Sequence, residues 1–290
     1  MKKLFVLLPA LLLPLSACSP QQPAGASPAP PAVSTPAAPV SPMPSPQPDS
    51  GPLWWEDISF SDLPSACSEP EDISAGSGGI YLLASLPEQE LSLYGYGGEM
   101  DGAPCGILIG QGTGLSPFDQ VYLSAESPAL PELWWNDFDG DGSGELAVKY
   151  LLANGASSLV YELHIYEPQP DGGWTDHSLT EREIDALLSA AVEYRFDAAA
   201  GIATASVPGE DASYRLGDQD PNPVADYALS FTGRTFYRYE DGFFTGVFGA
   251  GLCLQGLETL QYFATVTADV VYDGNGFSLE HLRLMEIGGV

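Results

Sequence analysis

The chain has 290 residues, with 9 basic against 39 acidic side chains and a formal net charge of −30 at pH 7. A field of that sign repels nucleic acid and anionic lipid head groups, so neither is expected as a partner. The acidic residues are spread along the sequence rather than gathered in one tail, so most of them are expected to lie on solvated faces.

The N-terminus has the pattern of an export signal. Lys2 and Lys3 precede an apolar run from Leu4 to Leu15. The run is shorter than the ~20 residues that a membrane-spanning helix needs, so it indicates a signal peptide. It ends in Leu15-Ser16-Ala17-Cys18, which resembles the lipobox of bacterial lipoproteins. The resemblance implies cleavage before Cys18, diacylglycerol on its thiol and often an acyl chain on its amine. The alternative is an ordinary secretory signal in which Cys18 is incidental.

A linker follows the signal. Residues 19–52 are rich in Pro, Ala, Ser and Gln and carry no charge before Asp49. Such a composition buries little apolar surface and favours extended polyproline II structure, so the segment is predicted to be a disordered stalk. The alternative is a disordered leader without a spacing role. The expected organisation is therefore a signal peptide at 1–18, a linker at 19–52 and one β-rich extracytoplasmic domain at 53–290.

Most of this domain is predicted to be antiparallel β-structure, because apolar and polar residues alternate between Gly- and Asp-rich turns. In residues 159–167 four apolar side chains share one face, and Glu162 and His164 share the other. Asn154-Gly155, Asp241-Gly242 and residues 273–276 are typical of hairpin turns. The strands predicted on this pattern are 81–86, 91–96, 107–109, 146–152, 159–167, 263–272 and 277–284.

One amphipathic helix is predicted after a capping box, in which Thr180 and Glu183 satisfy each other's backbone N–H groups. Four apolar residues between Ile184 and Ala191 then share one face, so the helix is expected to run to about Glu193.

A hairpin of residues 194–198 and 202–207 is expected after the helix. Residues 206–226 are polar and lack a clear periodicity, which favours a long loop. The expected fold class is therefore α+β, dominated by antiparallel sheet with one clear helix.

The segment from Asn136 to Leu146 carries the strongest chemical signal. Loop positions 1, 3, 5 and 9 are acidic and position 6 is glycine, as Asp137, Asp139, Asp141, Glu145 and Gly142. Calcium prefers six to eight oxygen ligands at ~2.3–2.6 Å, and alternating aspartates on a tight loop bring oxygens to one point. An EF-hand needs a glutamate at position 12, but Val148 occupies that position and belongs to a predicted strand. An EF-hand is thereby excluded.

A loop of this form that leads into a β-strand resembles the calcium loops of FG-GAP and VCBS repeats. By position, the resemblance implies side-chain ligands from Asp137, Asp139, Asp141 and Glu145 and a backbone oxygen from Ser143. Those families repeat the loop several times, whereas this chain has it once, so the resemblance favours a calcium site over a propeller. The alternative is an acidic turn without an ion, in which the carboxylates repel one another and raise some of their pKa values.

Other candidate residues carry weaker signals. Trp134 and Trp135 precede the loop and are candidate ligand-stacking residues for sugar rings, although neighbours on a strand point to opposite faces, so one of them is expected in the core. His177 lies between Asp176 and Ser178, but members of a catalytic triad rarely adjoin in sequence, and these residues are interpreted as the lead-in to the helix.

The cysteines apart from Cys18 are Cys67, Cys105 and Cys253, an odd number that cannot all pair within one chain. A disulfide is permitted outside the cell, and Cys67–Cys105 is the favoured pairing because both lie in polar contexts. Cys253 lies in an apolar stretch and is expected to be a buried small hydrophobe.

These features favour a lipid-anchored protein on the extracytoplasmic face of a bacterial cell membrane. The preferred function is a non-catalytic binding, adhesion or sensing module with one structural Ca²⁺, whose partner is a glycan or a surface protein. The alternative is a surface hydrolase that acts on glycan or peptide through a carboxylate pair. A role in supporting a neighbouring complex is a third reading.

Overall fold

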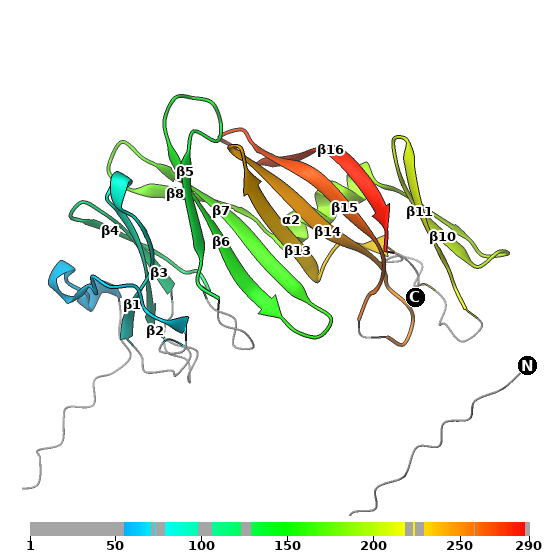
Figure 1. The fold of residues 1–290 in the computed structure, drawn as a ribbon, viewed down its shortest axis with the longest axis horizontal. Coiled ribbons are helices and arrows are strands. Elements are labelled where there is room, and N and C mark those ends of the chain that lie inside the picture. The colour runs from blue at the N-terminus through cyan, green and yellow to red at the C-terminus, as the bar shows by residue number, and fades with distance from the viewer. Residues whose placement is uncertain are drawn as a thin grey trace, which may run out of the picture. The chain divides into compact units, whose positions relative to one another are not determined.

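The computed structural model describes residues 55–70, 73, 79–97, 106–122, 129–217, 223, 229–257 and 259–287. Within them, sixteen β-strands and one α-helix form a mostly antiparallel β-fold, which confirms the predicted α+β class (Figure 1). Three short 3₁₀ helices accompany them: η1 (Trp55–Asp57), η2 (Phe60–Asp62) and η3 (Pro87–Gln89). The predicted signal peptide with its Cys18 and the whole linker lie outside the described residues.

The first sheet contains four antiparallel strands in the order β1-β2-β3-β4. The strands are β1 (Gly79–Leu86), β2 (Leu91–Gly97), β3 (Gly106–Gln111) and β4 (Gly114–Phe118). The strands predicted at 81–86, 91–96 and 107–109 fall within β1, β2 and β3 and are confirmed.

The main sheet follows the order β16-β15-β14-β13-β7-β6-β5, and β12 and β8 pair with β14 and β7. Its strands are β5 (Glu132–Asn136), β6 (Glu145–Asn154), β7 (Leu159–Pro168), β8 (Trp174–Leu179), β12 (Leu229–Ser230), β13 (Arg234–Glu240), β14 (Phe243–Leu252), β15 (Gln261–Tyr272) and β16 (Phe277–Glu286). The four strands predicted in this part of the sequence correspond to β6, β7, β15 and β16 and are confirmed.

Strand β7 has two partners along the edge that β6 leaves free. Arg234 and Thr235 of β13 pair in parallel with Leu159 and Val160, whereas β8 pairs with the later part of β7. Strand β13 therefore separates from β7 after Val160. The turn between β13 and β14 extends to the end of β5, where Nδ2 of Asn136 donates to the carbonyl oxygen of Gly242 at 3.4 Å.

Helix α2 (Glu181–Ala191) begins at the predicted capping box, with Thr180 as the N-cap and reciprocal bonds to Glu183. It ends two residues before the predicted limit, because Val192 is already extended and Glu193 starts the next strand. Figure 1 shows the helix behind β13 and β14.

The third sheet contains β9 (Glu193–Asp197), β10 (Ile202–Val207) and β11 (Glu210–Arg215), in the order β11-β10-β9. The predicted hairpin at 194–207 is confirmed. The prediction of a long loop at 206–226 is wrong for β11, which pairs with β10 from Val207↔Glu210 to Ile202↔Arg215. Only Ala212 of β11 is buried, so the strand depends on backbone pairing and gives little apolar signal.

Two hydrophobic cores meet at β6. Leu146, Val148 and Tyr150 pack against the first sheet, in a core that includes Leu93 and Ile107. Ala147, on the opposite face of β6, belongs to the larger core that contains Ile184 and Leu188 of α2, the third sheet and the inner face of β14 and β15. Because both faces are covered, the first seven residues of β6 are all buried. A smaller third core gathers Ile58, Leu82, Tyr94, Tyr96 and Leu108.

Cys67 is exposed and its thiol is free, and Cys105, the partner predicted for it, lies outside the described residues. Cys253 is also free and is half-buried rather than fully buried. No helix among the described residues has the length and apolar character needed to cross a membrane.

Candidate metal centre

The acidic loop joins two paired strands. Asn136, the last residue of β5, is in register with Glu145, the first residue of β6, so residues 137–144 form the connection. Gly140 and Gly142 have φ values of 79° and 94°, which lie in the left-handed region that glycine adopts most easily. A Cβ at either position would meet nothing within 4 Å, so the backbone conformation rather than space accounts for these glycines. The sharp turn predicted at Gly142 is confirmed.

The loop brings four carboxylates together. Asp137, Asp139, Asp141 and Glu145 each offer one oxygen, and these oxygens all lie within 4.8 Å of one another. Two oxygens on opposite sides of a calcium ion are separated by about 5 Å, twice the usual Ca–O distance. The four predicted side-chain ligands are therefore spaced as a cation site requires. Ser143 lies in the same loop, and the contribution of its carbonyl oxygen stays a prediction.

Backbone N–H groups hold the carboxylates in place. Asp137 accepts hydrogen bonds from Gly140 and Gly142 at 2.8 and 3.1 Å. Asp139 accepts one from the N–H of Asp141 at 3.0 Å, and Asp141 accepts one from the N–H of Ser143 at 2.6 Å. These bonds partly offset the repulsion among the carboxylates and fix their directions before any ion binds.

Glu145 is the buried member of the group, with 1% of its surface exposed. Burial raises its pKa to about 6, a bond from the N–H of Phe138 opposes the rise, and the charges of Asp139, Asp137 and Asp141 add to it. No Lys, Arg or His among the described residues forms an ion pair with Glu145. The site therefore holds a buried acid that lacks a compensating cation within that part of the chain.

The turn between β15 and β16 packs against the loop, as Figure 1 also shows. A Cβ on Gly274 would lie 2.7 Å from Oδ2 of Asp139. The sequence identified residues 273–276 only as a turn, and nothing local indicated this contact. The neighbouring Tyr272 is 4% exposed, and its hydroxyl has no hydrogen-bond partner among the described residues. Burial raises the pKa of Tyr272, and the charges of Glu167, Asp139, Glu145 and Asp273 raise it further.

An aromatic hollow of about 350 Å³ adjoins the loop. Its lining includes Asn136, Asp137 and Phe138, the β13–β14 turn, Tyr272 and Phe277. Phe243 at this turn is 73% exposed. Phe138 stacks on Phe244 with ring centroids 5.5 Å apart, so the loop is anchored to the larger core.

Trp134 and Trp135 point to opposite faces, as expected for adjacent strand residues, and both are half-buried. The ring of Trp134 lies 5.4 Å from that of Tyr239 and 5.3 Å from that of Phe244. Trp135 lies 6.3 Å from Trp174 and occupies the space beside Gly144. Both rings have packing roles, and a ligand-stacking role for them stays a prediction.

The histidines do not form a triad with their sequence neighbours. Asp176, His177 and Ser178 belong to β8, so they form a strand rather than a simple lead-in to the helix. Asp176 binds Nδ1 of His164 at 2.8 Å, whereas His177 lies 3.4 Å from Glu167.

His164 was predicted on the polar face of a strand but is 2% exposed, because the first sheet covers that face. Its ring stacks beside Tyr166 and lies edge-on to Tyr150, and the two tyrosine hydroxyls are 3.1 Å apart. Burial lowers the pKa of His164, but Asp176 and Glu162 outweigh burial and raise it to about 9.

Comparison of the chain with family models, with curated proteins and with solved structures gave no match. The likeness of the loop to known calcium loops therefore rests on the loop residues alone.

Proposed function

We propose that this chain is a lipid-anchored bacterial surface protein whose β-rich domain binds a partner without catalysis and is stabilised by one Ca²⁺ in the β5–β6 loop. The convergence of four carboxylates within 4.8 Å carries the calcium part of the proposal. The lipobox-like residues ending at Cys18 support the anchor. Stable membrane attachment requires more than one acyl chain, because one chain alone binds weakly.

The chemistry of the site favours calcium over other ions. All four side chains offer oxygen, which suits hard cations rather than metals that prefer nitrogen or sulfur. Several carboxylates on an irregular loop also suit the flexible coordination of calcium better than the strict octahedron of magnesium. Bound Ca²⁺ would neutralise part of the charge around the buried Glu145.

The ion would act on the fold rather than on a substrate. The loop joins β5 to β6, and Asp139 lies against Gly274 in the β15–β16 turn. A cation held by Asp139 and Glu145 would therefore tie the start of a doubly buried strand to a hairpin more than 120 residues away in the sequence. Binding to the native state alone stabilises it by mass action.

The hydrolase alternative receives less support. A catalytic acid needs a raised pKa and access to substrate. Glu145 is the carboxylate with a raised pKa among the described residues, yet it is 1% exposed and is bonded to the N–H of Phe138. It is not placed to protonate a substrate, so we favour the binding role.

Calcium titration of the whole chain in mild detergent tests the proposal, followed by thermal melts with Ca²⁺ and with chelator. We expect one binding event and a raised melting temperature in the parent chain, and loss of both in Asp139→Asn. Asp171→Asn is the matched control, because Asp171 bonds the N–H of Gly173 in an exposed turn outside the site. No heat and an unchanged melting temperature in the parent would refute the calcium site.

A further inference from the structure

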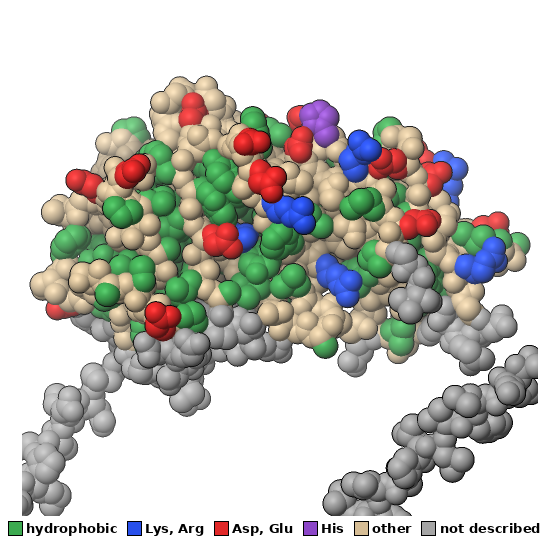
Figure 2. Space-filling model, in the orientation of Figure 1, with side chains coloured by type: hydrophobic (Ala, Val, Ile, Leu, Met, Phe, Trp, Pro, Cys, Tyr) green, Lys and Arg blue, Asp and Glu red, His purple; other side chains and the backbone are tan. Residues whose placement is uncertain are grey.

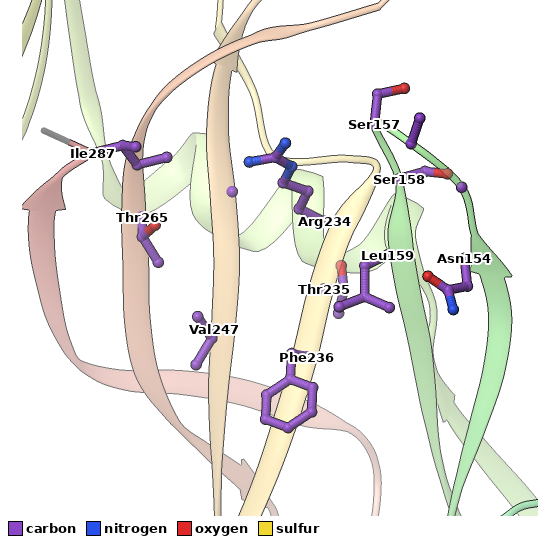
Figure 3. A pocket seen from close by; sticks show the side chains of 13 residues that line it. Asn154, Ser157, Ser158, Leu159, Arg234, Thr235, Phe236, Val247, Thr265 and Ile287 are labelled. Atoms are coloured by element: carbon purple, nitrogen blue, oxygen red, sulfur yellow. The ribbon is translucent and has the colours of Figure 1, made fainter. Parts of the chain in front are cut away.

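A second hollow of about 360 Å³ opens on the face of the main sheet opposite α2. Figure 3 shows Arg234 near its centre, with Ser157 and Ser158 of the β6–β7 turn on one side and Thr265 and Ile287 on the other. Phe236 and Val247 lie further along β13 and β14. The N–H of Leu159 donates to the carbonyl of Gly233 at 2.9 Å, which fixes the turn relative to the start of β13.

The side chain of Arg234 is held in place by an aromatic ring. Its guanidinium carbon lies 4.1 Å from the centroid of the Tyr262 ring, and the Tyr262 hydroxyl donates to the carbonyl of Thr232 at 2.7 Å. Gly249 provides the room, since a Cβ there would lie 2.8 Å from both the Arg234 Cβ and the Tyr262 ring. A guanidinium stacked on an aromatic face keeps its N–H edge available, and that planar edge matches a carboxylate.

Arg234 has no ion-pair partner in the part of the chain that the structure describes, although the carboxylate of Glu181 accepts from the N–H of the neighbouring Gly233. Arg195 and Arg283 form ion pairs with Glu193 and Glu210, whereas Arg234 forms none with a described carboxylate. One further cation lies near the same face, because the guanidinium carbon of Arg238 is 6.0 Å from the centroid of Phe236. Lys149 is 5.0 Å from the same centroid, but it is buried and paired with Glu132 at 2.8 Å. Figure 2 shows basic side chains among hydrophobic ones over β13 and β14. In a chain of net charge −30, Arg234 and Arg238, neither of them ion-paired with a described carboxylate, give this face a local positive charge that would attract an anionic group.

The other groups around the hollow indicate the rest of the ligand. Hydroxyl and amide side chains of Asn154, Ser157, Ser158 and Thr265 can exchange hydrogen bonds with ligand hydroxyls. Phe236 and Val247 offer an apolar surface for C–H groups. The volume lies at the lower end of the range for small-ligand sites. We infer that the hollow binds a carboxylate-bearing saccharide, with the uronic acid group on Arg234 and a sugar face on Phe236.

The inference rests on the binding role proposed above, because it places the bound partner in this hollow. None of the acidic-loop residues lines the hollow. Calorimetric titration of the whole chain in detergent with trigalacturonate tests it, with neutral galactotriose and triglutamate as the comparison probes. We expect binding of trigalacturonate alone, and about tenfold or more weaker binding in Arg234→Ala. Arg195→Ala is the matched control, because it removes one exposed positive charge outside the hollow and should leave the affinity unchanged.

Thr265→Val removes a hydroxyl while keeping the side-chain shape, and should weaken binding by about two- to tenfold. It serves as the second variant if Arg234→Ala fails to melt cooperatively. Equal affinity in the parent and in both variants would overturn the inference, as would equal binding of the neutral saccharide or no heat at millimolar trigalacturonate. Binding of triglutamate instead would assign the hollow to acidic peptides and overturn it too. The affinity for trigalacturonate should be the same in the presence of calcium and in the presence of chelator. The saccharide test can therefore fail while the calcium titration succeeds.

Discussion

The backbone N–H of Phe138 donates a 2.7 Å hydrogen bond to Oε2 of Glu145, which ties the second position of the acidic loop to the ninth. Phe138 itself packs on Phe244 of the larger core. Glu145 thus closes the loop through this hydrogen bond, and Phe138 anchors the loop to the core. An ion that binds Glu145 would act on a strand buried on both faces, so calcium occupancy and fold stability should be linked.

Glu145→Gln should stabilise the metal-free protein and remove its response to calcium. Folding raises the pKa of Glu145 from 4.5 to about 6, so its favourable contribution is complete below pH 4.5 and is lost as the pH rises through about 6. At neutral pH the buried charge therefore destabilises the metal-free fold. We expect Glu145→Gln to raise the free energy of unfolding by about 1–2 kcal/mol in chelator.

Urea denaturation with chelator and with calcium measures both effects, and the exposed Glu193→Gln serves as the control. A variant that kept the full calcium response would contradict the role of Glu145.

The buried His164 should make the fold less stable in alkali. Its folded pKa, about 9, exceeds the ordinary value of 6.5 because Asp176 and Glu162 outweigh burial. The stability that it contributes is complete below pH 6.5 and is lost as the pH rises through about 9. We expect the free energy of unfolding to fall by about 3 kcal/mol across this window, and His164→Gln to flatten the dependence.

Denaturation curves at several pH values check this expectation. His281→Gln is the matched control, because His281 also pairs with an aspartate, Asp269, but is exposed. An equal pH dependence in the parent and in His164→Gln would refute the prediction.

Local signals in the sequence were sufficient for several elements. Thr180 and Glu183 form the capping box that begins the helix, and the alternation in residues 159–167 is realised in β7. The acidic loop was identified because its ligand spacing is a property of nine consecutive residues.

Long-range relationships were beyond the sequence patterns. His164 shares a face of β7 with Glu162, and only the packing of the first sheet makes its position buried. The contact of Gly274 with Asp139 joins segments that are distant in the chain, and the hollow around Arg234 is assembled from five strands and the β6–β7 turn. Strand β11 gave no signal because it buries only Ala212.

Cys18→Ser should release the protein from the membrane. If Cys18 carries diacylglycerol and an acyl chain, its loss removes the apolar groups that hold the chain at the bilayer. We expect the parent chain in the membrane fraction and the variant in the soluble extracytoplasmic fraction, with a lipid-sized mass difference at the N-terminal peptide. Cys253→Ser is the control and should remain membrane-bound. Membrane attachment of Cys18→Ser without lipid would exclude the lipobox interpretation.

Gly144→Ala should destabilise the fold and weaken calcium binding together. A Cβ at this position would lie 2.5 Å from Cε2 and Nε1 of Trp135. That ring packs edge-on against Trp174 with centroids 6.3 Å apart, so it cannot move freely to make room. Overpacking of this kind lowers the free energy of unfolding by about 1–3 kcal/mol. The backbone at residue 144 would shift, and the shift would move Glu145, the next residue in the chain.

The matched control for this substitution is Gly276→Ala. Gly276 lies in the neighbouring β15–β16 turn, its Cβ would meet nothing within 4 Å, and its φ is not positive. We expect this control to change the free energy of unfolding by less than about 0.5 kcal/mol and to leave calcium binding unchanged. Urea denaturation and calcium titration of the two variants compare them directly. Equal effects of Gly144→Ala and Gly276→Ala would contradict the prediction. The contact between Trp135 and Gly144 would then not determine where β6 starts, and the position of Glu145 would depend on the loop alone.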